Sequence, residues 1–591
     1  MHHGGIYEDE IVGKAYDRAL MARFFRYLAP YRLLVAAALT VLPLTIVAKL
    51  AQPYLLKLAI DNHIMTGQLA GLPRLAALFL LLIMAESLLS FLEVWLLQYL
   101  GQRLMQDIRI ELFSHVQRLS PAFFDRTPTG SLVTRLTSDV EVLGEMFAAG
   151  IITVVGDLLL LVGIVVVMLW MNLQLSLVTF SVLPFLIWIA FAFRRRMRAA
   201  FRQVRARLAS LNTFLNESIS GMSLIQLSNR QAAEHEEFRR LNASYRDANL
   251  PVITWDAALY AGVEALSSVA VGLLIWYGGS EILGGTLTFG ALVAFIQYIE
   301  KFFSPIRDLS AKYSVMQGAM AALERLFNLL DTRDTLPEPD EAHRTTPPRP
   351  AAVIDFRDVW FAYQGDDHVL KGFNLTLRQG EKVALVGETG GGKTTVTRLL
   401  SRLYDVNRGG ITLDGIDLRD IPLTELRRRT GVVLQDPYLF TGTVEENICL
   451  GDEAARQRVR QAAAAVGADR IIDRLPHGYR EEVRERGANL SAGERQLISF
   501  ARAVAFDPEV LVLDEATASV DTASERLIQE GLKGLMAGRT TLVVAHRLST
   551  IRDADRIVVI HRGEKVEEGT HDRLMADRGI YYRLYQLQFK D

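Results

Sequence analysis

Long apolar runs occupy much of the chain between residues 33 and 308. Six of them are long enough to cross a bilayer, for which about 20 residues are needed. A soluble protein would need a very large shell to bury six such segments, so the sequence predicts a transmembrane α-bundle of six helices. The first run is too long and begins too late to be a cleaved signal peptide. The predicted spans are 33–59, 74–99, 147–171, 173–193, 255–277 and 287–308.

Basic residues are distributed unevenly around these spans. Lys and Arg are frequent before the first span and in 194–207, and they are absent from the short connections 61–73 and 278–286. Because cytoplasmic flanks carry the excess of Lys and Arg, both termini are expected in the cytoplasm, with the chain a multi-pass protein of the inner (cytoplasmic) membrane. The polar stretches 100–146 and 194–252 are expected to continue the helices into the cytoplasm, with short crossing segments at their tips.

The composition changes after the last span. Residues 331–351 are rich in Pro and charge, which is typical of a linker. Beyond them, short β-rich runs alternate with helical stretches, which predicts an α/β domain with a largely parallel sheet. The net charge of −2 gives no indication of nucleic-acid binding, and the one cysteine, Cys449, is expected to be a buried thiol. The predicted organisation is an N-terminal cytoplasmic segment (1–32), a transmembrane domain (33–330), a linker (331–351) and an α/β domain (352–591).

The first strand-like run of the α/β domain ends in a glycine-rich loop, "GETGGGKTT", which fits the pattern G-x-x-x-x-G-K-[ST]. Glycines let backbone N–H groups curl around phosphates, and the N-terminus of the following helix favours negative charge. Lys393 would reach the β- and γ-phosphates of ATP, and the Thr394 hydroxyl would ligate Mg²⁺. The predicted nucleotide-binding residues of this loop are Gly387, Glu388, Thr389, Gly390, Gly391, Gly392, Lys393, Thr394 and Thr395.

Two carboxylates follow a second apolar run, "VLVLDEATASVD" (510–521). Ligands of open α/β sheets bind beyond the carboxyl ends of the strands. Asp514 would complete the Mg²⁺ site and Glu515 would polarise an attacking water, whereas the alternative for this pair is a solvated turn. His546 ends another strand-like run, "TTLVVAH", and is either a hydrogen-bond donor to the γ-phosphate or a structural histidine.

Five motifs stand in one order: "GETGGGKTT", "LQDPYLFTGTVEENI", "NLSAGERQ", "LVLDEATASVD" and "VVAHRLST". Together they resemble the nucleotide-binding domain of an ABC transporter, and the six preceding spans resemble an exporter-type half-transporter of the multidrug and lipid-flippase group. The resemblance implies a P-loop α/β ATPase that drives export or flipping of a hydrophobic or amphipathic substrate, either a small molecule or a lipid. The alternatives are an importer built on the same fold and an ATP-gated channel or regulatory protein.

The resemblance also assigns roles to single residues. Tyr363 matches the aromatic residue that stacks on adenine, and Gln435 matches the glutamine that senses Mg²⁺ and the γ-phosphate. Ser519 and Asp521 match the loop that communicates across a dimer. Residues 120–143 and 215–229 look like the two intracellular loops that bear coupling helices. The stretch "LSAGE" resembles the family signature L-S-G-G-Q, which serves the nucleotide of the opposite subunit, through Ser491, Ala492, Gly493 and Glu494.

Two residues of this signature depart from the usual form. Ala492 replaces Gly, which costs little if its backbone angles are helical. Glu494 replaces Gln and adds a negative charge near a nucleotide. One of two paired half-transporters often carries an altered signature while its own Glu, here Glu515, is intact. The sequence therefore slightly favours a heterodimer of half-transporters over a homodimer.

Ionisable residues also occur inside the apolar runs, where they are functional candidates by default. Acids outnumber bases, and Glu86 and Glu93 share one helix face. Carboxylates and aromatic rings such as Tyr298 would suit a cationic amphiphile. The alternative is that these groups pair with each other or lie at the cytoplasmic margin. The candidate residues of a substrate cavity are Glu86, Glu93, Asp157, Glu264 and Glu300.

Overall fold

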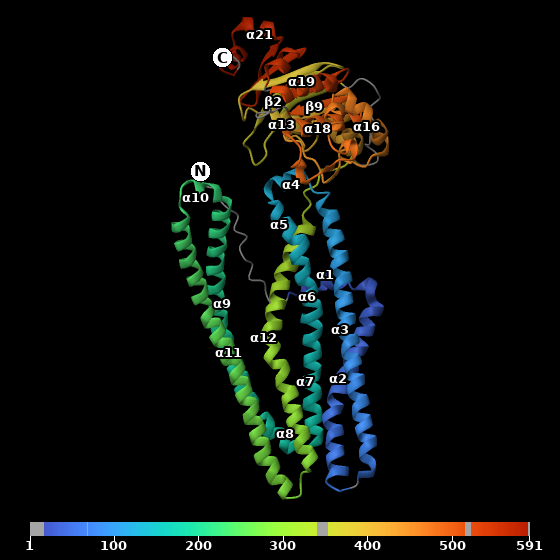
Figure 1. The fold of residues 1–591 in the computed structure, drawn as a ribbon, viewed down its shortest axis with the longest axis vertical. Coiled ribbons are helices and arrows are strands. Elements are labelled where there is room, and N and C mark those ends of the chain that lie inside the picture. Colours follow the sequence, from blue (N-terminus) through green and yellow to red (C-terminus); the bar gives the residue numbers. More distant parts are fainter. Residues whose placement is uncertain (1–16, 68, 340–352, 515–521, 546, 589–591) are drawn as a thin grey trace. The chain divides into compact units, whose positions relative to one another are not determined.

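The computed structural model describes residues 17–67, 69–339, 353–514, 522–545 and 547–588 (Figure 1). The chain divides into two compact units, of which the first comprises residues 1–116 and 130–332. The second comprises residues 117–129 and 333–591. A short segment between two helices of the first unit, 117–129, therefore packs with the C-terminal unit.

The first unit consists of helices (Figure 1). Apolar segments adopt helices in a bilayer because a helix satisfies its own backbone hydrogen bonds. Five stretches among the described residues are long and apolar enough to cross a membrane. The sixth predicted span begins α12, which falls outside that group because Gln297, Glu300 and Lys301 interrupt its apolar run. The helices are α1 (Arg18–Arg26), α2 (Arg32–Ala59), α3 (Leu72–Val116), α5 (Thr129–Thr134), α6 (Val140–Glu145), α7 (Ile152–Met171), α8 (Leu173–Phe180), α9 (Leu183–Ser220), α10 (Met222–Leu227), α11 (Gln231–Leu283) and α12 (Phe289–Asp331).

The fourth predicted span is present but is not one helix. It is divided into α8 and α9, with Ser181 and Val182 between them. Pro184 stands in the first turn of α9. Proline has no N–H to donate and its ring displaces the preceding carbonyl, so a helix tends to end just before it. This explains a break that hydropathy alone does not reveal.

Several helices extend well past their apolar runs, as predicted. α3 has 45 residues, and α9 and α11, which pack along each other, have 38 and 53. Short crossing helices lie at the ends of these extensions. They are α4 (Pro121–Arg126), which belongs to the second unit, and α10.

The second unit contains two larger sheets. The six-stranded sheet has the order β12-β11-β3-β10-β9-β6, and every pair except β11–β12 is parallel. This confirms the predicted parallel sheet. Four strands between residues 354 and 417 form a separate antiparallel sheet of order β2-β1-β4-β5, which the sequence did not predict. The strands are β1 (Ile354–Phe361), β2 (Leu370–Leu377), β3 (Lys382–Gly387), β4 (Arg408–Leu413), β5 (Ile416–Asp417), β6 (Thr430–Val433), β9 (Val510–Asp514), β10 (Thr540–Val544), β11 (Arg556–His561) and β12 (Glu564–Gly569), with β7 (Gly442–Thr443) and β8 (Glu482–Val483) forming a separate pair.

Helices and the antiparallel sheet pack against the parallel sheet and enclose two cores of apolar side chains. Cys449 lies in one of these cores with no solvent exposure, as expected for a structural thiol. The helices are α13 (Lys393–Leu400), α14 (Leu423–Arg429), α15 (Val444–Cys449), α16 (Glu453–Ala465), α17 (Asp469–Ile472), α18 (Ala492–Ala505), α19 (Thr522–Met536), α20 (Leu548–Arg552), α21 (His571–Asp577) and α22 (Ile580–Gln588).

Candidate active site

The carboxyl ends of the parallel strands bring distant motifs to one edge of the sheet. β3 ends at Gly387 and β9 ends at Asp514, with β10 lying between these two strands. Val544 of β10 is in register with Leu385 on one side and with Asp514 on the other. Gln435 follows the end of β6, the neighbour of β9. Four other candidate residues, Glu515, Ser519, Asp521 and His546, lie outside the described residues.

The loop after β3 needs glycine at both ends. A Cβ atom on Gly387 would lie 2.2 Å from the carbonyl oxygen of Ile560 in the neighbouring strand. Gly392 has a φ of 103°, which residues with a side chain rarely adopt. α13 begins at the next residue, so the loop leads directly into the N-terminus of a helix. This is the arrangement in which backbone N–H groups bind anions.

Lys393 is the buried cation of this loop. Its Nζ donates to the carbonyl oxygens of Gly387 at 2.8 Å and Glu388 at 2.7 Å. Burial lowers the pKa of the Lys393 ammonium, and the negative charges of Asp514 and Glu388 offset part of that shift. Thr394, in the first turn of α13, is exposed. The edge of the sheet thus holds a buried ammonium with hydroxyl, carboxylate and amide oxygens on the surrounding segments.

Tyr363 lies just after β1 and is held on several sides. Its hydroxyl shares a hydrogen bond of 3.1 Å with the Thr395 hydroxyl in the first turn of α13. Its ring packs edge-on against Phe361 and Tyr404, with ring centres 4.9 and 5.2 Å apart. Tyr363 is nevertheless 37% exposed, so part of the residue remains accessible to solvent.

The segment that resembles the family signature begins α18. Ser491 is the N-cap, and its hydroxyl accepts a hydrogen bond from the Glu494 N–H at 3.3 Å. The Glu494 carboxylate accepts one in return from the Ser491 N–H at 2.7 Å, which completes a capping box. Ala492 is the first helical residue, which is the condition under which Ala is expected to cost little in place of Gly. Gly493 is buried in the same turn.

Comparisons with known proteins agree with this geometry. Residues 35–306 match the ABC transporter transmembrane region, and residues 370–518 match the ABC transporter family. The "Uncharacterized ABC transporter ATP-binding protein YknV" of Bacillus subtilis is 39% identical, over 98% of this chain and 96% of its own length. The chain belongs to the ABC transporter family.

Other relatives show which branch of ABC transporters this is. An "ATP-dependent lipid A-core flippase" of Syntrophus aciditrophicus is 37% identical, over 91% of this chain and 89% of its own length. A solved structure of a bacterial Atm1-family ABC exporter with ATP bound has a TM-score of 0.78 and 28% identity, with 95% of this chain and 99% of that chain covered. The ABC transporter described here is therefore a membrane-embedded half-transporter of the exporter type, in which ATP hydrolysis is coupled to transport.

Part of the surroundings of the nucleotide site in this ABC transporter was not predicted. Asp125, Arg398 and Tyr404 form a network beside Tyr363. Sequence analysis placed Asp125 in a coupling-helix loop without a contact of its own, and it singled out neither Arg398 nor Tyr404. Asp125 and Arg398 are 273 residues apart in the sequence, so no local pattern could have indicated the contact.

The acidic residues of the membrane unit do not form one cluster. Asp157 pairs with Lys312 of α12, a cation that sequence analysis did not consider. Glu86 accepts a hydrogen bond from Ser90, one turn later, at 3.2 Å. Glu264 and Glu300 are exposed. No group of three or more His, Cys, Asp or Glu side chains that could hold a metal occurs in the part of the chain that the structure describes.

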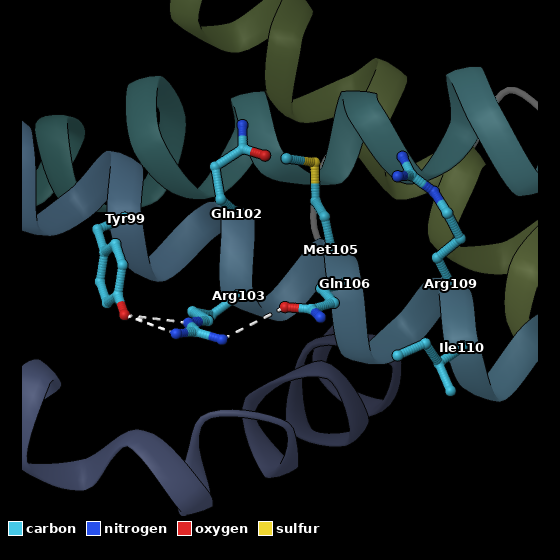
Figure 2. Close-up of a pocket in the computed structure, with 7 residues that line it drawn as sticks. All are labelled: Tyr99, Gln102, Arg103, Met105, Gln106, Arg109 and Ile110. Carbon is cyan, nitrogen blue, oxygen red and sulfur yellow. Dashed lines mark hydrogen bonds between the residues drawn. The ribbon is translucent and has the colours of Figure 1, made fainter.

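Tyr298 is buried within the helix bundle, and its hydroxyl donates to the Leu50 carbonyl at 2.6 Å. A hollow of about 440 Å³ lies along α3 (Figure 2). Arg103 and Tyr99 lie side by side there, joined by a hydrogen bond of 2.9 Å. The hollow is lined by Tyr99, Gln102, Arg103, Met105, Gln106, Arg109 and Ile110.

Proposed function

We propose that this ABC transporter exports a hydrophobic or amphipathic substrate from the cytoplasmic side of the inner membrane, with both termini in the cytoplasm. The observation that best supports this proposal is that Lys393, Asp514 and the glycine loop lie at one edge of the sheet. The same chain also contains helices long and apolar enough to span a membrane. The working parts are the transmembrane domain (33–330) and the ATPase domain (352–591), joined by the linker 331–351 and preceded by the segment 1–32.

ATP is the proposed substrate of the ATPase domain. The N–H groups of the loop and the N-terminus of α13 would bind its phosphates, with Lys393 at the β- and γ-phosphates, while adenine stacks on Tyr363. Thr394, Gln435 and Asp514 offer the hydroxyl, amide and carboxylate oxygens that Mg²⁺ prefers, and they lie on segments at the same edge of the sheet. When bound there, Mg²⁺ neutralises charge on the phosphates.

Hydrolysis needs groups beside the γ-phosphate. We assign the orientation of the attacking water to Glu515 and a hydrogen bond to the γ-phosphate to His546, with Ser519 and Asp521 linking the two nucleotide sites of a dimer. Each signature segment, from Ser491 to Glu494, would close on the nucleotide held by the other subunit, with the N-terminus of α18 directed at the phosphates.

The capping box bears on the choice between a homodimer and a heterodimer. The Glu494 carboxylate is engaged with the Ser491 N–H, and Gln at this position can make the same bond. This supports two competent signatures and weakens the sequence argument for a heterodimer. A second half-transporter is required in both cases, and we propose that a second copy of this chain can serve.

The substrate is best described by its amphipathic character. The hollow along α3 carries Arg103 and Arg109, which favour an anionic head group over the cationic one that the carboxylates indicated. The names of two relatives refer to lipid A and to a fatty acid. Stimulation of the ATPase rate by anionic but not by cationic amphiphiles supports this preference, and Arg103→Gln should remove the difference.

The ATPase rate of the chain alone tests the function. The full chain in lipid nanodiscs should hydrolyse ATP when Mg²⁺ is present, and Glu515→Gln should abolish hydrolysis while leaving ATP binding intact. ATP binding without hydrolysis by the wild-type chain would show that a different second half-transporter is needed. Absence of ATP binding would contradict the assignment of the glycine loop.

A further inference from the structure

Within the second unit, hydrogen bonds hold the crossing helix α4 at both of its ends. Before α4, the Ser120 N–H and hydroxyl donate to the carbonyl and the carboxylate of Asp334, each at 2.7 Å. At its end, Arg126 donates to the other carboxylate oxygen of Asp334 at 3.2 Å. Both ends of α4 are therefore bound to one residue, Asp334, in the segment that precedes the ATPase domain.

Between these ends, the Asp125 carboxylate accepts two hydrogen bonds from the ATPase fold. One comes from Arg398 Nη1 at 3.4 Å and the other from the Tyr404 hydroxyl. Arg398 lies on α13, the helix that begins in the glycine loop at Lys393. Burial raises the pKa of Tyr404 to about 12, and the hydrogen bond to Asp125 adds to that shift. The Tyr404 phenol therefore stays protonated and remains a donor.

The two partners of Asp125 both contact the Tyr363 ring. Tyr404 meets it edge-on, with an angle of 89° between the ring planes. The guanidinium carbon of Arg398 lies 5.8 Å from the centre of the Tyr363 ring. With its hydroxyl bonded to Thr395, the ring is held on several sides, and two of these contacts depend on groups that Asp125 binds.

We propose that Asp125 is a positioning residue for adenine binding, and that through Tyr404 and Arg398 it sets the orientation of Tyr363. A movement of residues 117–129 would then change the affinity for the base of the nucleotide without altering the glycine loop that holds the phosphates. This role rests on the proposed stacking of adenine on Tyr363.

Steady-state kinetics of the full chain in nanodiscs separates base from phosphate recognition. Asp125→Asn weakens the bonds to Tyr404 and Arg398 and should raise the KM for ATP about three- to tenfold, with kcat unchanged. The inhibition constant of tripolyphosphate, which lacks a base, should stay the same. Asp125→Glu should restore most of the ATP affinity. Asp367→Asn removes an exposed carboxylate from the loop after Tyr363 and should leave every constant unchanged.

Two further variants make the outcome decisive. Tyr404→Phe keeps the ring and loses the donor, so it should raise the KM for ATP in the same direction as Asp125→Asn. In a Tyr363→Leu background, Asp125→Asn should have no additional effect. An unchanged KM in Asp125→Asn, or equal weakening of ATP and tripolyphosphate, would overturn the role of Asp125. An unchanged KM in Tyr363→Leu alone would remove the stacking role as well.

Discussion

The two crossing helices have the same length but different surroundings. α4 and α10 are each six residues long, and both follow helical extensions of the membrane unit. α4 packs with the second unit, where Asp334, Arg398 and Tyr404 hold residues 117–129. α10 stays with the first unit and exposes Met222, Leu224 and Leu227. One chain thus provides a docking surface for the first crossing helix and leaves apolar side chains of the second exposed to solvent.

This difference indicates what a second half-transporter contributes. Apolar side chains that are exposed next to one another mark contact surfaces more often than isolated ones do. In the proposed dimer we expect the other subunit to cover α10, so that each ATPase domain binds one crossing helix from its own chain and one from its partner.

The largest expected effect follows from charging α10. Leu224→Asp with Leu227→Asp would bury two carboxylates in the proposed contact and lose about 2 kcal/mol per leucine from burial alone. We expect substrate to stop stimulating the ATPase rate and the dimer to dissociate more readily. Leu587→Asp in α22 is the matched control, because Leu587 and Leu227 are both 83% exposed. If the α10 variant and the Leu587→Asp control have the same ATPase stimulation and the same dimer stability, α10 is not part of the dimer contact.

An intermediate effect is expected when α4 is loosened. Asp334→Ala removes the carboxylate that binds Ser120 and Arg126, which should weaken docking of residues 117–129 by about 1–2 kcal/mol. Backbone amide exchange in this segment should accelerate about tenfold, while exchange in α10 should not change. Exchange that accelerates equally in both crossing helices would show that they do not dock independently.

A smaller effect is expected at the signature. Glu494→Ala loses half of the capping box and should cost about 1 kcal/mol at the start of α18, whereas Glu494→Gln should be nearly neutral. The free energy of unfolding and the ATPase rate should be measured for the wild type, Glu494→Ala and Glu494→Gln and compared. A large rate increase in Glu494→Gln would show instead that the negative charge impairs closure on the nucleotide.

The smallest effect concerns pH. An unperturbed tyrosine ionises near pH 10, and the pKa of Tyr404 is about 12. Because the pKa of Tyr404 is raised, the hydrogen bond from its hydroxyl to Asp125 contributes fully to stability below about pH 10. This contribution is lost as the pH rises through about 12. The protection of the backbone amides of residues 117–129 from exchange, relative to the intrinsic rate at each pH, should therefore be constant from about pH 6 to pH 9. Phenolate absorbance, compared with Tyr404→Phe, should report the late ionisation.

What could be predicted from the sequence depended on how local each signal is. The glycine loop, the apolar runs and the strand that ends at Asp514 are each encoded within a short stretch, and the structure contains them. The division between α8 and α9 was missed because hydropathy averages over Ser181 and Pro184. In the antiparallel sheet, β1 pairs with the next strand, β2, but also with β4, which follows β3 and α13, so the sheet as a whole has no local pattern. The Asp125 network joins three separate segments, so it carries no local pattern.

Charges in the membrane unit illustrate the same limit. Asp157 was noticed as an acid inside an apolar run, but its partner Lys312 lies 155 residues later, on another helix. Lys301 was overlooked, and its Nζ donates to the Lys49 carbonyl and to Gln52 of α2. Composition shows that such residues are present, whereas only the packing of helices shows which of them are paired.

The burial of Cys449 has a practical consequence. The chain has one cysteine, and its thiol lies in a closed core with no exposure, so thiol reagents that need solvent access should bypass it in the folded protein. Leu227→Cys and Phe124→Cys, one at each crossing helix, would then be the main points of attachment for spin labels or fluorophores. Distances between such labels could be followed through the ATP cycle without first removing the native thiol.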